Sequence, residues 1–235
     1  MTQKTHWFNC FKSTLLFIIF IWLIKLIEQM YFFDFHFMAI YPREFSGLIG
    51  ILCAPFLHGS WGHLAANTFP LLVLGSLHTY GYPKTKWKTL LIILLVSGVG
   101  VWLFGRPNYH LGASSITSGL FYFLLIAGLF RRDRVSICLM LIAVFMFGSI
   151  LLGIFPLDPK ISFEAHFFGA LGGSICAFLF EKQDSKPPVK VYEWEKEGYS
   201  IEDEGEYWKI GYVEPGEPLP PIDHQRDQFP PITKK

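Results

Sequence analysis

The sequence has few charged residues for its length. Only 17% of its 235 residues are Asp, Glu, Lys or Arg, whereas 51% are hydrophobic and 17% are aromatic. A soluble domain usually carries about 25% charged residues. The scarcity of charge therefore argues against an ordinary soluble domain. The formal net charge of +1 also gives no excess of positive charge that would attract nucleic acid.

Motifs for common cofactors and metals are missing as well. The chain has no glycine-rich phosphate-binding loop, no dinucleotide fingerprint and no His-Glu-x-x-His motif. We therefore expect no cofactor, no metal and no nucleic acid partner. The cysteines have no paired spacing, so we predict neither disulfides nor a zinc site and interpret them as buried small hydrophobes; they are Cys10, Cys53, Cys138 and Cys176.

Long apolar runs are what the sequence does contain. A membrane-spanning helix needs about 20 largely apolar residues. Six runs meet this need, at about residues 12–33, 61–80, 88–105, 112–130, 135–155 and 162–180. We predict an all-α, polytopic membrane protein with a six-helix bundle over residues 12–181, for which the lipid bilayer is the expected surroundings.

The basic residues of the short connections predict the orientation of these helices. They gather before the first run, between the second and third, between the fourth and fifth, and after the sixth. Because such residues are enriched in cytoplasmic loops, we expect both chain ends to be cytoplasmic and the second, fourth and sixth helices to start at the outer membrane face. Residues 1–11 form the expected cytoplasmic N-terminus.

The composition changes after the sixth run. Residues 182–235 hold 12 Asp or Glu, 8 Lys or Arg and 8 of the 15 prolines. We interpret this segment as an acidic, proline-rich cytoplasmic tail that is partly disordered, with an allowed small hairpin at residues 189–213.

Polar side chains stand at the outer ends of three of the predicted spans. His63 and Asn67 are four residues apart, and so share one face of the second helix. Ser114 begins the fourth helix, and His166 lies in the first turn of the sixth. Hydrogen-bonding groups within spanning helices usually face a bundle interior or a wet cavity, which makes them functional candidates.

Small residues predict which helix faces meet. Ser115 and Gly119 on the fourth helix, with Gly169 and Gly173 on the sixth, form ridges that allow two backbones to approach closely. This approach would bring Ser114 near His166. An imidazole can accept the serine proton during attack on a carbonyl and return it to the leaving amine.

The remaining polar groups fit the same chemistry. His63, Asn67 and the backbone around Gly112 at the start of the fourth helix can donate hydrogen bonds to a developing oxyanion. Glu164 is two residues before His166, about 200° round a helix, so we expect it to point away from the serine, to the headgroup boundary. The set predicts acyl transfer by a Ser-His dyad without a third member.

These residues resemble the rhomboid intramembrane serine proteases. The pattern H-x4-H-x3-N occurs at His58, His63 and Asn67, followed by Gly-Ala-Ser ending at Ser114 and by A-H-x2-G-x3-G at residues 165–173. The resemblance covers about residues 10–181, and two longer stretches look like a bacterial subgroup.

The resemblance implies a role for each matching residue. Ser114 would be the nucleophile and His166 the base, with His63 and Asn67 helping to hold the oxyanion, while His58 would fix the loop before the second helix. It also implies transmembrane protein substrates, cleaved near the outer membrane face of a bacterial cell membrane. One departure is Ser115, which replaces the usual glycine after the nucleophile and would crowd the oxyanion site or slow turnover.

The same residues are compatible with two other functions. A catalytically silent rhomboid-like protein would bind or escort transmembrane helices, and Ser115 gives this idea some weight. A metal transporter or metalloprotease could use His58, His63 and His166, but no carboxylate or thiolate completes the set. His78 and His110 are interpreted as structural, and Ser115 and Ser118 as packing residues or hydroxyls bonded to backbone, since serine in a spanning helix commonly bonds to the preceding turn.

Overall fold

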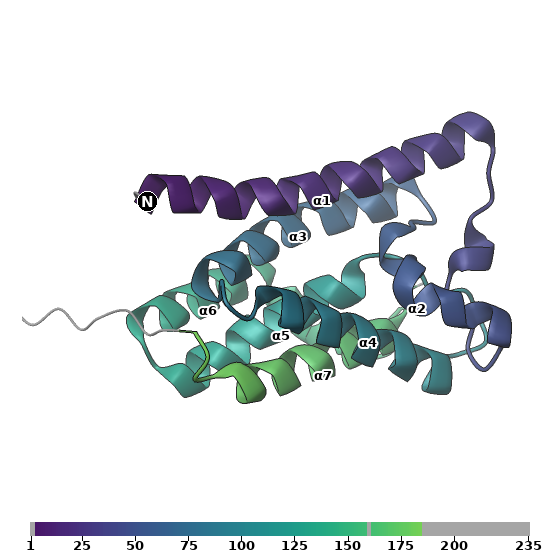
Figure 1. Ribbon diagram of the computed structural model, residues 1–235. Coiled ribbons are helices and arrows are strands. Elements are labelled where there is room, and N and C mark those ends of the chain that lie inside the picture. Colours follow the sequence, from purple (N-terminus) through teal and green to yellow (C-terminus); the bar gives the residue numbers. More distant parts are fainter. Residues whose placement is uncertain (1–2, 159–160, 185–235) are drawn as a thin grey trace, which may run out of the picture. The chain divides into compact units, whose positions relative to one another are not determined.

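The computed structural model describes residues 3–158 and 161–184, and the predicted tail hairpin lies outside them. Within this part the chain forms helices and loops without named strands, apart from one isolated bridge between Ile40 and His110. The long helices are α1 (Gln3–Tyr31), α3 (Trp61–Gly81), α4 (Lys86–Phe104), α5 (Ser114–Arg131), α6 (Arg134–Phe147) and α7 (Phe163–Phe180). Figure 1 shows them as one bundle.

Short helices fill two connections. Between α1 and α3 the chain forms the 3-10 helices η1 (His36–Met38), η2 (Phe45–Ile49) and η3 (Ala54–Phe56) and one turn of α-helix, α2 (Gly50–Cys53). Between α6 and α7 it forms η4 (Gly148–Ile154). These segments run over the end of the bundle where α3, α5 and α7 begin, which we call the site end; the end where α4 and α6 begin is the basic end.

The long helices have the length and composition of membrane spans. Five candidates qualify by themselves: Cys10–Tyr31, Lys86–Phe104, Ser114–Arg131, Arg134–Ile154 and Phe163–Phe180. A sixth is reached when Phe45–Phe56 and Trp61–Gly81, bent by 63° at their break, count as one span. The predicted all-α membrane bundle is thus confirmed. The first helix starts at Gln3, earlier than the predicted residue 12.

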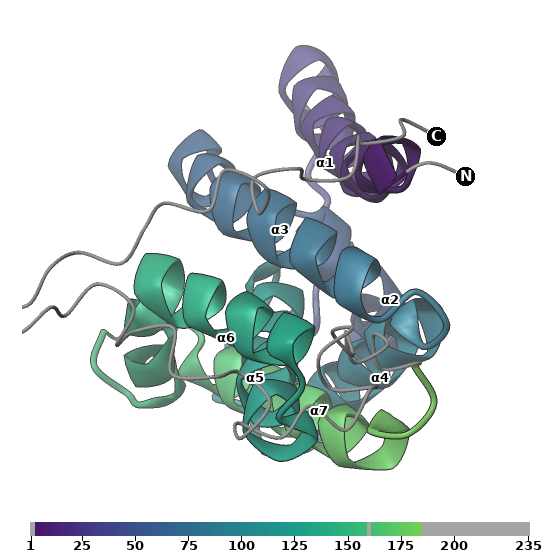
Figure 2. The ribbon, with the colours of Figure 1, turned by 90° about the vertical axis from the view of Figure 1, so that its left-hand side faces the viewer.

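Helix α5 lies at the centre of the bundle. It contacts α3, α4, α6 and α7. The span formed by α5 is 67% buried, whereas the span that begins with α6 is only 17% buried. Figure 2 shows α1 packed on the outer side of α3, away from α5. Because α6 is peripheral, Cys138 on it is exposed, and its interpretation as a buried hydrophobe is wrong; Cys10 and Cys176 are buried.

Helices α5 and α7 touch through their backbones. A Cβ placed on Gly169 would overlap the carbonyl oxygen of Ser115, and one on Gly173 would overlap that of Gly119. Only glycine allows such an approach, because any larger side chain would force the two helices apart. The contact brings the first turns of the two helices side by side at the site end.

Candidate active site

A cavity of about 620 Å³ opens at the site end of the bundle. Its lining includes Ser114, His166, His63 and Asn67, the four polar residues singled out in the sequence. They come from the first two turns of α3 and the first turns of α5 and α7. The remaining lining comes largely from the loop before α5 and the residues before α7, which supply Arg106, Asn108, Tyr109, His110, Leu111, Ile161 and Ser162.

Ser114 is the first residue of α5 and is partly buried. One helical turn further, Ser118 donates a hydrogen bond of 2.9 Å to the backbone carbonyl of His166. Residues four apart lie on the same face of a helix, so Ser114 belongs to the face of α5 that meets α7 at His166. The Ser118 hydroxyl therefore bonds to backbone, as predicted, but to a carbonyl of α7 and not to one of its own helix.

The orientation of His166 is set by a residue outside its own helix. Its Nδ1 lies 3.0 Å from the carbonyl oxygen of Gly153 in η4. A carbonyl oxygen can only accept a hydrogen bond, so Nδ1 must carry the proton. In the neutral ring this leaves Nε2 with a free lone pair, which is the state that a general base requires.

His63 and Asn67 surround the backbone that leads into Ser114. A Cβ added to Gly112 would lie 2.8 Å from Nε2 of His63 and 3.7 Å from Nδ2 of Asn67. The Asn67 side chain is buried, and its Nδ2 has no hydrogen-bond partner among the described residues. An amide nitrogen in that position is a donor that is available to a bound group.

Gly112 contributes its shape to the site. Its φ of +117° is one that residues with a side chain rarely adopt. Its own N–H donates to the carbonyl of Ala54 at 2.8 Å, so the expectation that it would face the oxyanion is corrected. The free backbone donors here are the first N–H groups of α5, beginning with that of Ser114, which have no acceptor within the helix.

His58 anchors the same turn. It is only 3% exposed, and its Nε2 accepts a hydrogen bond of 3.3 Å from the N–H of Ala113. Its ring also makes an edge contact with the ring of His63, with 5.1 Å between the centroids. His58 thereby connects the loop before α3 to the start of α5 and supports His63 from behind.

Ser115 does not line this cavity. Its side chain is buried and lies beside a small interior space of about 20 Å³, between α5 and the α2 and α4 helices. The change from glycine to serine therefore lies on the packing side of the helix and adds no side chain to the active-site cavity.

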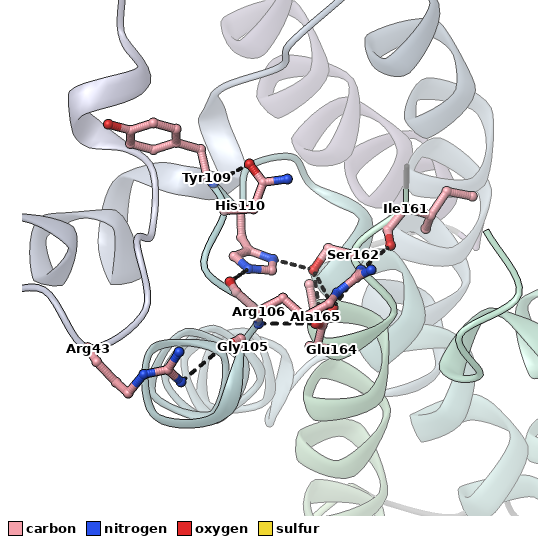
Figure 3. Close-up of polar contacts among 10 residues, drawn as sticks. Arg43, Gly105, Arg106, Tyr109, His110, Ile161, Ser162, Glu164 and Ala165 are labelled. Carbon is pink, nitrogen blue, oxygen red and sulfur yellow. Dashed lines mark hydrogen bonds and ion pairs between the residues drawn. The ribbon is translucent and has the colours of Figure 1, made fainter. Parts of the chain in front are cut away.

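Glu164 does not line the cavity, as its helical position predicts. It is 5% exposed and forms an ion pair with Arg106, with Nε and Oε1 2.6 Å apart. Figure 3 shows this pair beside the backbone N–H of Arg106, which also donates to Oε1. A buried carboxylate needs such partners, and here they connect the loop after α4 to the first turn of α7.

His110 joins the same network (Figure 3). Its ring is buried, with Nδ1 2.6 Å from the hydroxyl of Ser162 and Nε2 2.9 Å from the carbonyl of Arg106. Ser162 in turn caps α7 by accepting the N–H of Ala165 at 3.2 Å. Both ring nitrogens are thus occupied, which fits the interpretation of His110 as structural.

Several residues of the site carried no signal in the sequence. Gly153 lies 13 residues before His166, and Arg106 lies 58 residues before Glu164. Neither spacing belongs to a helical or strand repeat, so only the fold reveals these pairs. Among the described residues, no group of three or more His, Cys, Asp or Glu side chains is arranged to hold a metal ion.

Comparison with known proteins agrees with this arrangement. The Rhomboid domain family matches residues 46–183. The chain is 36% identical over 195 residues to the uncharacterized proteins Mb1372 of Mycobacterium bovis and Rv1337 of Mycobacterium tuberculosis, covering 79% of this chain and 81% of each relative. The uncharacterized protein ML1171 of Mycobacterium leprae is 33% identical, covering 78% of this chain and 76% of that protein. The chain therefore belongs to the rhomboid family of multi-pass membrane proteins, a family of intramembrane proteases.

Proposed function

We propose that this protein is an intramembrane serine endopeptidase in which Ser114 and His166 form the catalytic dyad. One observation carries the proposal. The two residues line one cavity from touching helices, and the bond from His166 Nδ1 to Gly153 leaves Nε2 free to take a proton. Substrates would be transmembrane proteins whose helices are weak near the outer face of a bacterial cell membrane, with both ends of the protease in the cytoplasm.

The reaction follows from the donors and acceptors of the cavity. Nε2 of His166 takes the proton of the Ser114 hydroxyl as Oγ attacks the scissile carbonyl carbon. The oxyanion forms next to the Asn67 amide, His63 and the first N–H of α5. His166 then gives its proton to the leaving amine, and water admitted by the cavity hydrolyses the acyl-enzyme with the same base.

The proposal is tested with a serine-directed fluorophosphonate probe and a labelled transmembrane substrate, on the full chain reconstituted in vesicles. We expect Ser114→Ala to abolish labelling, and both Ser114→Ala and His166→Ala to reduce cleavage by at least about a thousandfold. Ser115→Ala is the matched control, because it removes the neighbouring hydroxyl from the packing side and should leave both readouts close to those of the native chain.

Two outcomes would contradict the proposal. Labelling that survives in Ser114→Ala would place the nucleophile elsewhere. A native chain that binds the substrate without cleaving it, in every lipid tried, would instead support a protein that escorts transmembrane helices.

A further inference from the structure

A second cavity, of about 340 Å³, lies between α1, α3 and α4 and extends from the basic end to η3 and the first turn of α5. We call it the α1–α3–α4 groove. It is separate from the active-site cavity, and the two have no lining residue in common. Its floor is made by Ile116 and Leu120 of α5, and its lip by Trp87 and Leu91 of α4, whose side chains are exposed on the bundle surface.

The groove changes in polarity along the bundle axis. Its polar residues lie at the basic end: Ser13 and Thr14 near the start of the α1 span, His78 and Thr79 in the last turn of α3, and Lys86 in the first turn of α4. Towards mid-bundle the lining of the groove is apolar. It includes Leu94, which is eight residues after Lys86 on α4 and therefore about 12 Å further along the helix axis. A lipid in one leaflet of a bilayer likewise has its polar headgroup at the membrane surface and its apolar acyl chains towards the middle.

The polar end carries positive charge and an unused hydrogen-bonding group. Lys86 lies over the ring of Trp87, with its Nζ 5.3 Å from the centroid, and none of the described residues that line the groove is acidic. His78 is 1% exposed, and its Nε2 has no hydrogen-bond partner among the described residues. Its ring is held by edge contact with Phe123, at 4.8 Å between centroids. Buried polar atoms are rarely left unpaired.

We propose that the α1–α3–α4 groove binds one anionic phospholipid. One acyl chain would lie along the apolar part, and the headgroup phosphate would meet Lys86 at the level where His78 can bond to a phosphate or glycerol oxygen. Basic pockets between transmembrane helices are known to bind anionic headgroups in this way. Trp87 would sit at the headgroup level, where tryptophan is favoured.

A single acyl chain is much thinner than a helix, which is about 10–12 Å across with its side chains. Because the described lining residues include Lys86 and no Asp or Glu, the groove favours an anionic lipid over a cationic or zwitterionic one.

Native mass spectrometry of the full chain in detergent tests this proposal. The protein is titrated with phosphatidylglycerol and, separately, with phosphatidylcholine of the same acyl chains. We expect tighter binding of one phosphatidylglycerol. Lys86→Gln should weaken that binding about fivefold, the usual effect of one basic residue near an anionic headgroup, and His78→Phe should weaken it while keeping the ring packing.

Lys88→Gln is the matched control. It removes the same charge two residues along α4, from an exposed lysine that does not line the groove, so binding should be unchanged. Equal retention of the two lipids would overturn the proposal, as would equal losses in Lys86→Gln and Lys88→Gln, because either result indicates attraction by the general charge of this end. Retention of a second copy of the chain that competes with lipid would overturn it as well. None of these outcomes depends on proteolytic activity.

Discussion

Two groups of buried polar residues, the one around Arg131 at the basic end and the one around His166 at the site end, use their hydrogen-bonding capacity differently. At the basic end, Arg131 is 4% exposed, and its guanidinium group is hydrogen-bonded on several sides. Its Nε donates to the carboxylate of Asp133 and to the hydroxyl of Ser136, both at 3.0 Å. Its Nη1 donates to the carbonyls of Glu181 and Asp184 at 2.8 and 3.0 Å. This arrangement, the Arg131 cluster, joins the ends of α5 and α7 to the start of α6.

The site end leaves acceptors and donors open. Nδ2 of Asn67 has no partner in the described part of the chain, and Nε2 of His166 retains its lone pair beside a cavity of about 620 Å³. A fully paired cluster stabilises one structure, whereas a partly paired one costs stability. The difference teaches that polar residues in a membrane bundle indicate chemistry only where their hydrogen-bonding capacity is unfilled and space adjoins them.

Breaking the Arg131 cluster should have the largest effect on folding. In Arg131→Met the carboxylate of Asp133 and two backbone carbonyls lose their shared donor while buried. We expect the free energy of unfolding to fall by about 3–5 kcal/mol, measured by denaturant titration in detergent micelles. The activity of the protein that remains folded should be unchanged, since the cluster lies at the end opposite the site.

The control for this variant is Arg134→Met, which removes an exposed arginine at the start of α6. Its unfolding should match that of the native chain. If Arg131→Met instead lowered activity without lowering stability, the assignment of a structural role to the Arg131 cluster would be wrong.

A substitution at Gly112, at the site end, should lower activity strongly and stability only slightly. In Gly112→Ala the new Cβ meets the His63 ring at 2.6–2.8 Å and the residue must hold a φ of +117°. His63 is then displaced from the oxyanion position, and we expect cleavage to fall about a hundredfold, the usual effect of losing one such donor. Strain at one residue costs only about 1–3 kcal/mol of stability.

The rate of fluorophosphonate labelling and the denaturation midpoint together measure this result. Gly148→Ala serves as the comparison, because a Cβ there meets nothing within 4 Å. Native activity in Gly112→Ala would show that the close contact with His63 has no part in the reaction.

A smaller effect is expected where the network of Figure 3 supports the site. Glu164→Gln keeps the shape of the side chain but removes the ion pair that holds the first turn of α7, and with it His166. Because the Arg106 side chain is 43% exposed, water weakens the pair, and we expect kcat to fall by less than about tenfold, with KM unchanged.

The readout for this variant is steady-state cleavage, and Glu44→Gln, on an exposed acidic residue outside the network, is the control. Introducing Arg106→Glu and Glu164→Arg together should restore part of the lost rate. A rise in KM without a fall in kcat would instead mean that the network shapes substrate binding.

Sequence patterns were sufficient for the parts of the molecule that depend on local periodicity. The apolar runs located the spans to within a few residues, and the four-residue spacing of His63 and Asn67 placed both on one face of α3. The glycines at 169 and 173 located the contact between α5 and α7. Each of these inferences needs only the geometry of one helix and the size of a side chain.

The pairings that cross between distant segments could not be predicted in this way. Glu164 was placed correctly away from Ser114, but its partner Arg106 lies in a loop whose course no repeat defines. The same is true of Gly153 and of the contacts from Arg131 to the carbonyls after α7, about 50 residues away. Loop backbones supply these partners, and their positions depend on the packing of the whole bundle.

The smallest expected effect is the contribution of Asp133, at the basic end, to the pH dependence of stability. Burial would raise the pKa of Asp133, but hydrogen bonds from the N–H and hydroxyl of Ser136 and from Arg131 outweigh it and lower the pKa below its ordinary value of 3.8. The folded chain therefore binds the proton less readily than the unfolded chain, so this contribution to stability is fully present above about pH 4 and is lost as the pH falls through the lowered pKa. Denaturation midpoints measured between pH 6 and pH 3 should fall more steeply for the native chain than for Asp133→Asn, which has no proton to gain there. Equal slopes would show that the Arg131 cluster does not hold Asp133 in its charged form, and the contrast between a closed and an open end would then rest on the cavity alone.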